Sequence, residues 1–263
     1  MSQVLPAKAE CIVAVKPSRA QWDETKKLLE TYNQNQDKDN KCHQFKAVLE
    51  QRLIALHPKF KEAASDDCVR EVVKEDNNGE YAADDDNALE GAEAEINIGD
   101  HSSIVTDAHV LQVAVAILAE KTNDNHKVLV FCEFRKVLNV FGKVLREREM
   151  EHHCIHGDAK IEEREKQMND FNKNETSTKK IMLVSTRAGG TGLTLIGADT
   201  VLILGPNWNP TADDQAVGRA YRIGQNCPVT AFRFAVASLI DEEASLLHSQ
   251  LFRYCQDNAH MTN

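Results

Sequence analysis

The 263-residue sequence lacks several features that mark common classes of protein. It contains no Gly-x-x-x-x-Gly-Lys-Ser/Thr segment, so no phosphate-binding loop with its lysine is present. It also lacks an acidic segment of the Asp-Glu-x-His kind, which would hold magnesium. No apolar run is long enough to span a membrane, and no apolar signal region opens the chain. We therefore expect a soluble intracellular protein that has no phosphate loop of its own.

The cysteines indicate neither a disulfide framework nor a zinc site. There are seven, scattered along the chain, and no Cys-x-x-Cys pair occurs. His152, His153 and His156 cluster near Cys154, but this segment reads as a buried strand. Side chains of a strand alternate in direction, so these four cannot all point one way. We expect reduced thiols and no bound metal.

Hydrophobic periodicity predicts alternating helices and strands. Apolar residues at three- and four-residue spacing, together with the end signals of the last helix, indicate helices at Gln21–Asn33, His43–Leu56, Thr106–Lys121, Arg135–Glu149, Ile161–Asn172, Thr211–Tyr221 and Asp241–Tyr254. Short apolar runs indicate strands at Lys127–Cys132, His152–Ile155, Ile181–Val184, Val201–Leu204 and Val229–Val236. Continuous apolar strands between helices are typical of parallel sheets buried on both sides. We therefore expect an α/β fold with a parallel sheet flanked by helices.

The segment Asp214–Gln225 carries the strongest chemical signal. On a helix, Gln215, Arg219 and Arg222 would project from one face, because positions three and four apart are neighbours. A guanidinium stays charged and binds phosphate oxygens bidentately. Two of them suit the charge that builds up during phosphoryl transfer. The alternative is a solvated helix face with salt-bridged arginines.

Two loops precede this helix, each after a predicted strand. The first, Ser185–Leu195, contains a Gly-Gly-Thr-Gly run, and the second is Gly205–Pro210. Glycines after a strand let the backbone approach a ligand, and free amides there can hold phosphates. In open parallel sheets, ligands bind at the carboxyl ends of strands, where both loops and the arginine helix are expected. A tight turn is the plainer explanation of the glycine run taken alone.

In their order, these segments resemble motifs five and six of the superfamily-two helicases. The endings Trp-Asn-Pro and Arg-Ile-Gly-Gln are similar to those of Swi/Snf-type chromatin-remodelling ATPases, nearest to the recombination and ATRX-like branch with the plant DRD/CLASSY-type remodellers. Val128–Phe134 is similar to the family's motif four, and Ile155–Gly157 followed by Phe171-Asn172 resembles another family segment. The resemblance covers about Lys127–Ala237 and implies a RecA-like lobe, the C-terminal one of two.

The resemblance also implies roles for individual residues. Arg219 and Arg222 would reach the terminal phosphates of ATP, with Gln215 acting beside them. Gly190, Gly192 and Gly218 would line the nucleotide pocket or couple the lobes. The residues that would contact DNA are Ser185, Thr186, Arg187, Trp208 and Asn209. The family usually has acidic residues where this chain has Gly205-Pro206-Asn207, so the path of that loop is in question.

The same resemblance implies a division of the chain. Residues 1–65, with Val13–Ser18 and Leu56-His57-Pro58, look like the helical protrusion between the lobes, and residues 101–263 look like the C-terminal lobe. ATP with magnesium would be bound mainly by a first lobe that this sequence lacks, supplied in cis or in trans. We therefore expect the chain to be inactive alone, to act on duplex DNA or nucleosomes in the nucleus, and to have no membrane partner.

Residues 66–100 separate these parts and account for the net negative charge of the chain. The formal net charge is −10, and this stretch carries −11 from thirteen acidic and two basic residues. Such a composition does not bury enough surface to fold. We expect a disordered acidic linker that serves as a solvating tether. The alternative is a mimic of a phosphate backbone that occupies the basic DNA groove and inhibits binding.

Three functions remain open from the sequence. The first is the second motor lobe of an ATP-dependent DNA translocase that remodels chromatin. The second is a non-catalytic DNA or chromatin interaction module, derived from a remodeller by loss of the first lobe. The third is an RNA helicase lobe, against which Trp-Asn-Pro and Arg-Ile-Gly-Gln argue by resemblance.

Overall fold

The computed structural model describes residues 5–34, 41–63, 107–156, 160–172, 178–186, 192–205, 207 and 210–237. The expected acidic linker 66–100 and the expected helix Asp241–Tyr254 lie outside these residues. The chain divides into two compact units. One comprises Met1–Lys16 with Val110–Asn263, and the other is Pro17–His109.

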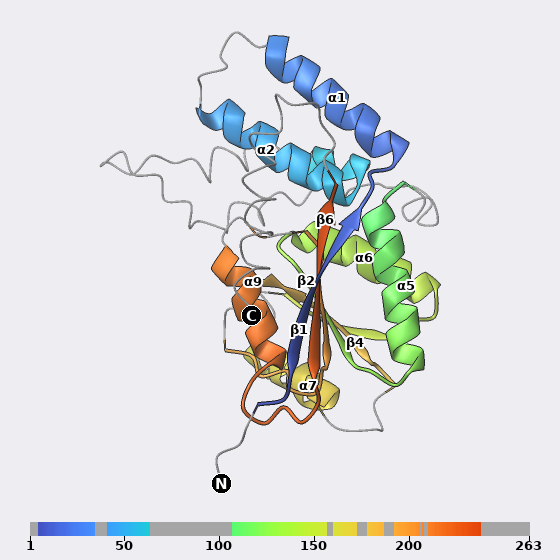
Figure 1. Ribbon diagram of the computed structural model, residues 1–263, viewed down its shortest axis with the longest axis vertical. Coiled ribbons are helices and arrows are strands. Elements are labelled where there is room, and N and C mark those ends of the chain that lie inside the picture. Colours follow the sequence, from blue (N-terminus) through green and yellow to red (C-terminus); the bar gives the residue numbers. More distant parts are fainter. Residues whose placement is uncertain are drawn as a thin grey trace, which may run out of the picture. The chain divides into compact units, whose positions relative to one another are not determined.

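The first unit is built on a six-stranded sheet in which every strand pairs in parallel (Figure 1). The strand order is β1-β6-β5-β2-β4-β3. The strands are β1 (Lys8–Val15), β2 (Val128–Cys132), β3 (His152–Ile155), β4 (Ile181–Ser185), β5 (Thr200–Ile203) and β6 (Val229–Val236). The helices are α5 (His109–Asn123), α6 (Arg135–Glu147), α7 (Ile161–Asn172) and α9 (Pro210–Ala220). The expected α/β fold with a parallel sheet flanked by helices is confirmed.

The inner strands are buried along their whole length. Every residue of β2, β4 and β5 is buried, whereas the edge strands β1 and β3 are partly exposed. Uninterrupted apolar runs such as Val128–Phe131 suit this position, because helices cover both faces of the sheet. This burial explains why the sequence predicted these strands within one residue of their bounds.

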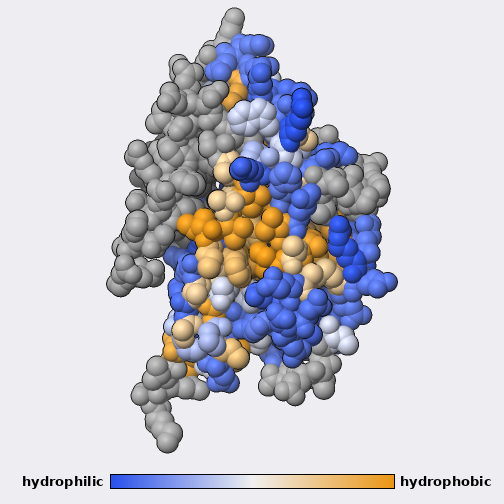
Figure 2. Space-filling model, turned by 45° about the vertical axis from the view of Figure 1, so that its right-hand side comes forward, coloured by the Kyte–Doolittle hydropathy of each residue, from blue (hydrophilic) through white to orange (hydrophobic). Residues whose placement is uncertain are grey.

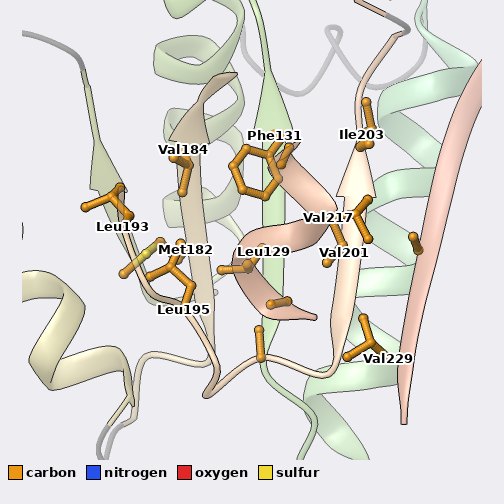
Figure 3. Packing of buried hydrophobic residues seen from close by; sticks show 14 of the residues in the cluster. Leu129, Phe131, Met182, Val184, Leu193, Leu195, Val201, Ile203, Val217 and Val229 are labelled. Atoms are coloured by element: carbon orange, nitrogen blue, oxygen red, sulfur yellow. The ribbon is translucent and has the colours of Figure 1, made fainter. Parts of the chain in front are cut away.

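Different helices cover the two faces of the sheet (Figure 1). On one face, α6 buries seven residues at helical spacing, among them Phe141. On the other face, α7 contributes Phe171 and α9 contributes Val217 to a core that includes Leu129 and Phe131 of β2 (Figure 3). The helix α9 begins at Pro210, where the fixed backbone angle of proline suits a first helical position.

The strand β1 is a finding that the sequence did not predict. Its register places Glu10 beside Ala231 and Ile12 beside Arg233, on a partner strand more than 200 residues away. The charged residues Lys8 and Glu10 interrupt its apolar pattern, so the segment lacks the continuous run that identified the inner strands.

As an edge strand, β1 keeps much of its surface exposed. Ile12, for example, retains 41% of its area in contact with solvent. Figure 2 shows hydrophobic residues gathered in the middle of one face, bordered by hydrophilic ones. A strand that buries little apolar surface depends more on its polar contacts, which in β1 include the carboxylate of Glu10.

The second unit contains α1 (Arg19–Gln34), α2 (Lys41–Leu56) and the 3-10 helix η1 (Pro58–Ala63). A capping box begins α1, because Gln21 N–H donates to Ser18 Oγ at 3.1 Å and Ser18 N–H donates to Gln21 Oε1 at 2.8 Å. The Gln21 amide also donates to the carbonyls of Ile54 and Ala55 at 3.0 and 2.7 Å, which joins α1 to the end of α2. Among the helices described, none has the length and apolarity needed to cross a membrane.

Candidate functional site

The candidate site begins where β4 and β5 end, on either side of the end of β2. Ser185 closes β4 and is 1% exposed, and the next residue, Thr186, is half-buried. Gly205 follows β5 with φ of 83°, a left-handed conformation that favours glycine. Thr186 therefore presents more surface to a ligand than Ser185 does.

The segment that returns from the first loop is fixed by the end of α7. The side-chain amide of Asn172 donates to Thr194 O at 2.8 Å and accepts the Gly197 N–H at 3.0 Å. A Cβ on Gly197 would lie 3.0 Å from the backbone of Asn172, so a larger residue would fit only if the helix end shifted by a few tenths of an ångström. Gly192 opens the segment with φ of 81°. The Phe-Asn pair of the sequence thus has a structural task, which is to hold the loop against the helix end.

The helix α9 follows with a buried and an exposed side. Ala216, Val217 and Ala220 enter the core. Gln215 and Gly218 are exposed, and Arg219 is half-buried. The apolar side anchors the helix on the sheet, and the polar side carries the predicted site residues.

Arg222 lies beyond the helix, because α9 ends at Ala220 and residues 221–224 form a bend. The helical three-residue spacing is therefore not what relates it to Arg219. Instead the bend carries Arg222 back to the loop, where its Nη1 donates to Thr194 Oγ1 at 3.3 Å. Leu195 N–H donates to Arg219 O at 3.0 Å, so loop and helix end are bonded twice.

The two guanidinium groups influence each other electrostatically. Burial and the nearby charge of Arg222 both lower the pKa of Arg219. Neighbouring like charges concentrate positive potential, which favours a bound anion. The pair is thus suited to phosphate oxygens, the ligand chemistry that the sequence predicted.

Gln225 is a residue whose task sequence reasoning missed. Its Nε2 donates to the carbonyls of Ile196, Ala198 and Ala220 at 3.1, 2.7 and 3.2 Å. Its Oε1 accepts the N–H groups of the next two residues, each at 2.9 Å. Gln225 is 7% exposed, so it does not meet a ligand but fixes the bend that holds Arg222. The available signal in the sequence was the glutamine that ends the Arg-Ile-Gly-Gln segment.

Four predicted site residues cannot be placed: Arg187, Gly190, Trp208 and Asn209 lie outside the described residues. Asn207, just before Trp208, is described, and its N–H donates to Asp213 Oδ2 of α9 at 3.1 Å. This bond ties the second loop to the amino end of the arginine helix.

The histidine cluster near β3 is organised by pairs. Cys154 Sγ lies 3.3 Å from His156 Nε2, and His153 Nε2 lies 3.1 Å from the carboxylate of Asp170. Burial raises the pKa of the Cys154 thiol to about 11, which keeps it protonated. Within the described part of the chain, no group of three or more histidine, cysteine, aspartate or glutamate side chains could hold a metal ion.

Comparison with known families agrees with this geometry. Residues 109–224 match the model of the helicase conserved C-terminal domain. This part of the chain is a helicase C-terminal domain. The match covers β2 to β5, both loops and α9, and it ends at the bend after Arg222.

The relatives of this helicase C-terminal domain are Swi2/Snf2-type remodelling ATPases. The DNA excision repair protein ERCC-6-like of Danio rerio is 35% identical over 60% of this chain, the ATP-dependent DNA helicase DDM1 of Arabidopsis thaliana is 42% identical over 45%, and the lymphoid-specific helicase of Homo sapiens is 37% identical over 53%. Their aligned parts are 10%, 15% and 16% of those proteins. The chain therefore spans a small part of the length of these relatives.

Two solved structures share the fold. The C-terminal part of the Fun30 ATPase domain has a TM-score of 0.63 at 20% identity, over 94% of this chain and 90% of that one. The SWI2/SNF2 ATPase core of Sulfolobus solfataricus, solved with double-stranded DNA, has a TM-score of 0.61 at 21% identity, over 88% of this chain and 42% of that one. The expected RecA-like helicase C-terminal fold is confirmed, whereas the assignment to the ATRX-like branch stays a prediction.

Proposed function

We propose that this chain is the second motor lobe of an ATP-dependent DNA translocase that acts on chromatin in the nucleus. The observation that carries the proposal is the meeting of Arg219 and Arg222 with the Gly192–Leu195 segment, where the returning chain and the end of α9 bring two guanidinium groups together. The loops after Ser185 and Ile203 begin at the carboxyl ends of β4 and β5, where ligands bind in such sheets, whereas the two arginines lie toward the amino ends of the strands.

In this function the chain supplies charge and another lobe supplies the phosphate loop. A first lobe, in cis or in trans, holds ATP with its magnesium. Arg219 and Arg222 then approach the terminal phosphates and stabilise the negative charge of the transition state. Gln215, exposed one turn before Arg219, contacts the nucleotide or the facing lobe, and Gly218 and Gly192 leave room for that approach. Gly190 is assigned to the same pocket.

Duplex DNA is the proposed track. Thr186 and the backbone amides after Ser185 hold strand phosphates, and Arg187 adds a charged contact. Trp208 lies against a base or sugar, and Asn209 beside it donates to the backbone. The Sulfolobus core, solved with double-stranded DNA, supports this track by its likeness of fold.

The test is to supply a first lobe and measure ATP hydrolysis. The first lobe of the Arabidopsis relative, joined ahead of the 263-residue chain, should give ATP hydrolysis that duplex DNA stimulates. The chain alone should give none, because it lacks a phosphate loop. The joined protein must first bind ATP and must fold as judged by circular dichroism. No DNA-stimulated hydrolysis in such a protein would refute the proposal.

A second candidate is a non-catalytic module that binds DNA or chromatin without a motor. The lack of a phosphate loop favours it for a chain that acts alone. If the chain is such a module, the 263-residue protein should bind duplex DNA tightly. Arg222→Ala should then change neither DNA binding nor ATP hydrolysis by the joined protein. The motor lobe predicts that binding survives the same substitution while hydrolysis by the joined protein is lost. Competition with single-stranded RNA separates both from an RNA helicase lobe.

A further inference from the structure

Four charged side chains from three separate elements meet beside the amino end of α9. Arg233 of β6 lies 3.2 Å from Glu10 of β1, 2.7 Å from Asp214 and 3.6 Å from Asp213, measured between nitrogen and carboxylate oxygen. We call these residues the Arg233 cluster. It joins the edge strand, its neighbour and the arginine helix at one point.

Arg233 and Asp213 are shielded from water, whereas the side chains of Glu10 and Asp214 are 30% and 63% exposed. The Arg233 side chain is 15% exposed, and Asp213 is 2% exposed. Burial alone would lower the pKa of Arg233, but the facing carboxylates of Glu10, Asp213 and Asp214 outweigh it and raise the pKa. Burial likewise tends to raise the pKa of Glu10, and contacts with Lys8 and Arg233 lower it instead. The Arg233–Asp213 pair is therefore screened little by solvent and salt, while the pairs with Glu10 and Asp214 are open to water on one side.

An arginine suits this position because its planar guanidinium has five N–H donors in fixed directions. Arg233 uses Nε toward Glu10, while Nη2 donates to Asp214 and Nη1 faces Asp213. A lysine ammonium carries the same charge without the planar fork that can address three carboxylates at once. The arrangement is therefore specific to arginine and not to positive charge alone.

The cluster reaches the candidate site through Asp213. The same Oδ2 that faces Arg233 accepts the N–H of Asn207, in the loop that leads to Trp208. At the other end of α9, Gln225 Nε2 donates to Ala220 O, and Leu195 N–H donates to Arg219 O. The arginine helix is thus held at both ends, and the cluster holds the end nearest the loop.

We infer that Arg233 is a positioning residue that, with Glu10 of β1, sets the placement of α9 and of the Asn207 loop. The inference deepens the proposed function and rests on it for its effect on DNA and ATP. Glu10 and Arg233 both lie outside residues 109–224, the part that matches the helicase C-terminal domain. The working site therefore extends beyond that domain to the first strand of the chain.

The test is amide hydrogen exchange of the 263-residue protein, followed by mass spectrometry. Arg233→Gln should make peptides covering 205–220 exchange about tenfold faster, as local opening of a helix end does. Peptides from α6, on the other face of the sheet, should not change. Arg233→Lys should restore part of the protection, and Glu10→Gln should reproduce a weaker form of the defect. A uniform rise over the whole sheet, or no change in 205–220, would overturn the inference.

Duplex DNA binding gives the functional readout, with a control matched for charge. Arg233→Gln should weaken binding about threefold more than Lys143→Gln, which removes the same charge from an exposed site on α6. Equal losses, with the exchange result as expected, would show that the cluster orders the helix without positioning a DNA contact. Hydrogen exchange needs neither DNA nor ATP. If the proposed function proved wrong, the exchange experiment would therefore still test whether Arg233 positions α9.

Discussion

The two faces of the sheet are covered in different ways. The face under α6 is closed mainly by apolar side chains, six of them buried from one helix. The face under α7 and α9 has an apolar core as well, but its helix ends are fixed by polar side chains, namely Asn172, Gln225 and Arg233. One face therefore serves stability, and the other combines stability with the placement of charged groups.

The difference teaches how a lobe can present two arginines toward a site without burying them. Apolar packing is roughly proportional to area and does not fix direction, whereas hydrogen bonds do. Leu195 N–H donates to Arg219 O near the end of α9, and Arg222, just beyond that end, donates to Thr194 Oγ1, so these two bonds specify where the arginines lie. Substitutions on the two faces should consequently separate stability from function.

The largest effect on stability is expected on the α6 face. Phe141 is fully buried, so Phe141→Ala should lower the free energy of unfolding by about 3–5 kcal/mol, from lost transfer energy and a residual cavity. Urea unfolding followed by circular dichroism measures it, with the exposed Lys143→Ala on the same helix as the control. A loss below about 1 kcal/mol would contradict the account of this face, because a well-packed site does not collapse so easily.

A smaller loss is expected at Gln225, where hydrogen bonds replace apolar packing. Gln225→Ala leaves three buried carbonyls and two amides without this partner and should cost about 1–3 kcal/mol. The same variant should move Arg222 and reduce hydrolysis by the joined protein. Gln225→Glu keeps the acceptor but loses the donor, so it should not restore stability. Activity unchanged in Gln225→Ala would show that the bend does not depend on this residue.

The smallest effect is expected at the exposed site residues themselves. Gln215 and Arg222 are exposed, so Gln215→Ala and Arg222→Ala should each change the free energy of unfolding by no more than about 0.5 kcal/mol. Thermal and urea unfolding of both variants beside the parent protein measure this. A loss above about 1.5 kcal/mol in either would mean that the residue is structural and would remove the contrast between the two faces.

The fold was largely accessible from the sequence because its inner strands are uninterrupted apolar runs. The helix Ile161–Asn172 and the strand Val229–Val236 have the predicted bounds. The strand Lys8–Val15 was missed because its partner, Val229–Val236, lies at the far end of the chain and because Lys8 and Glu10 break its pattern. Local periodicity carries no information about such a distant pairing.

For the candidate site, the sequence proposed residues but not their geometry. The sequence identified Arg219 and Arg222 by their spacing, yet the structure relates them by a bend that Gln225 closes against Ile196 and Ala198. It also assigned Ser185 a contact role, although that side chain is buried at the strand end. Contacts between residues more than twenty positions apart decide both points, and no local pattern shows them.

The most direct test of the central claim is the turnover number of the joined protein with Arg222→Ala. Loss of an arginine that stabilises the transition state should lower kcat by about three to five powers of ten, while duplex DNA binding and unfolding stay at the level of the parent protein. Lys143→Ala, on the other face of the sheet, should leave kcat unchanged. Hydrolysis that persists in Arg222→Ala at the parental rate would contradict the account, because the arginine would then play no part in completing the ATP site.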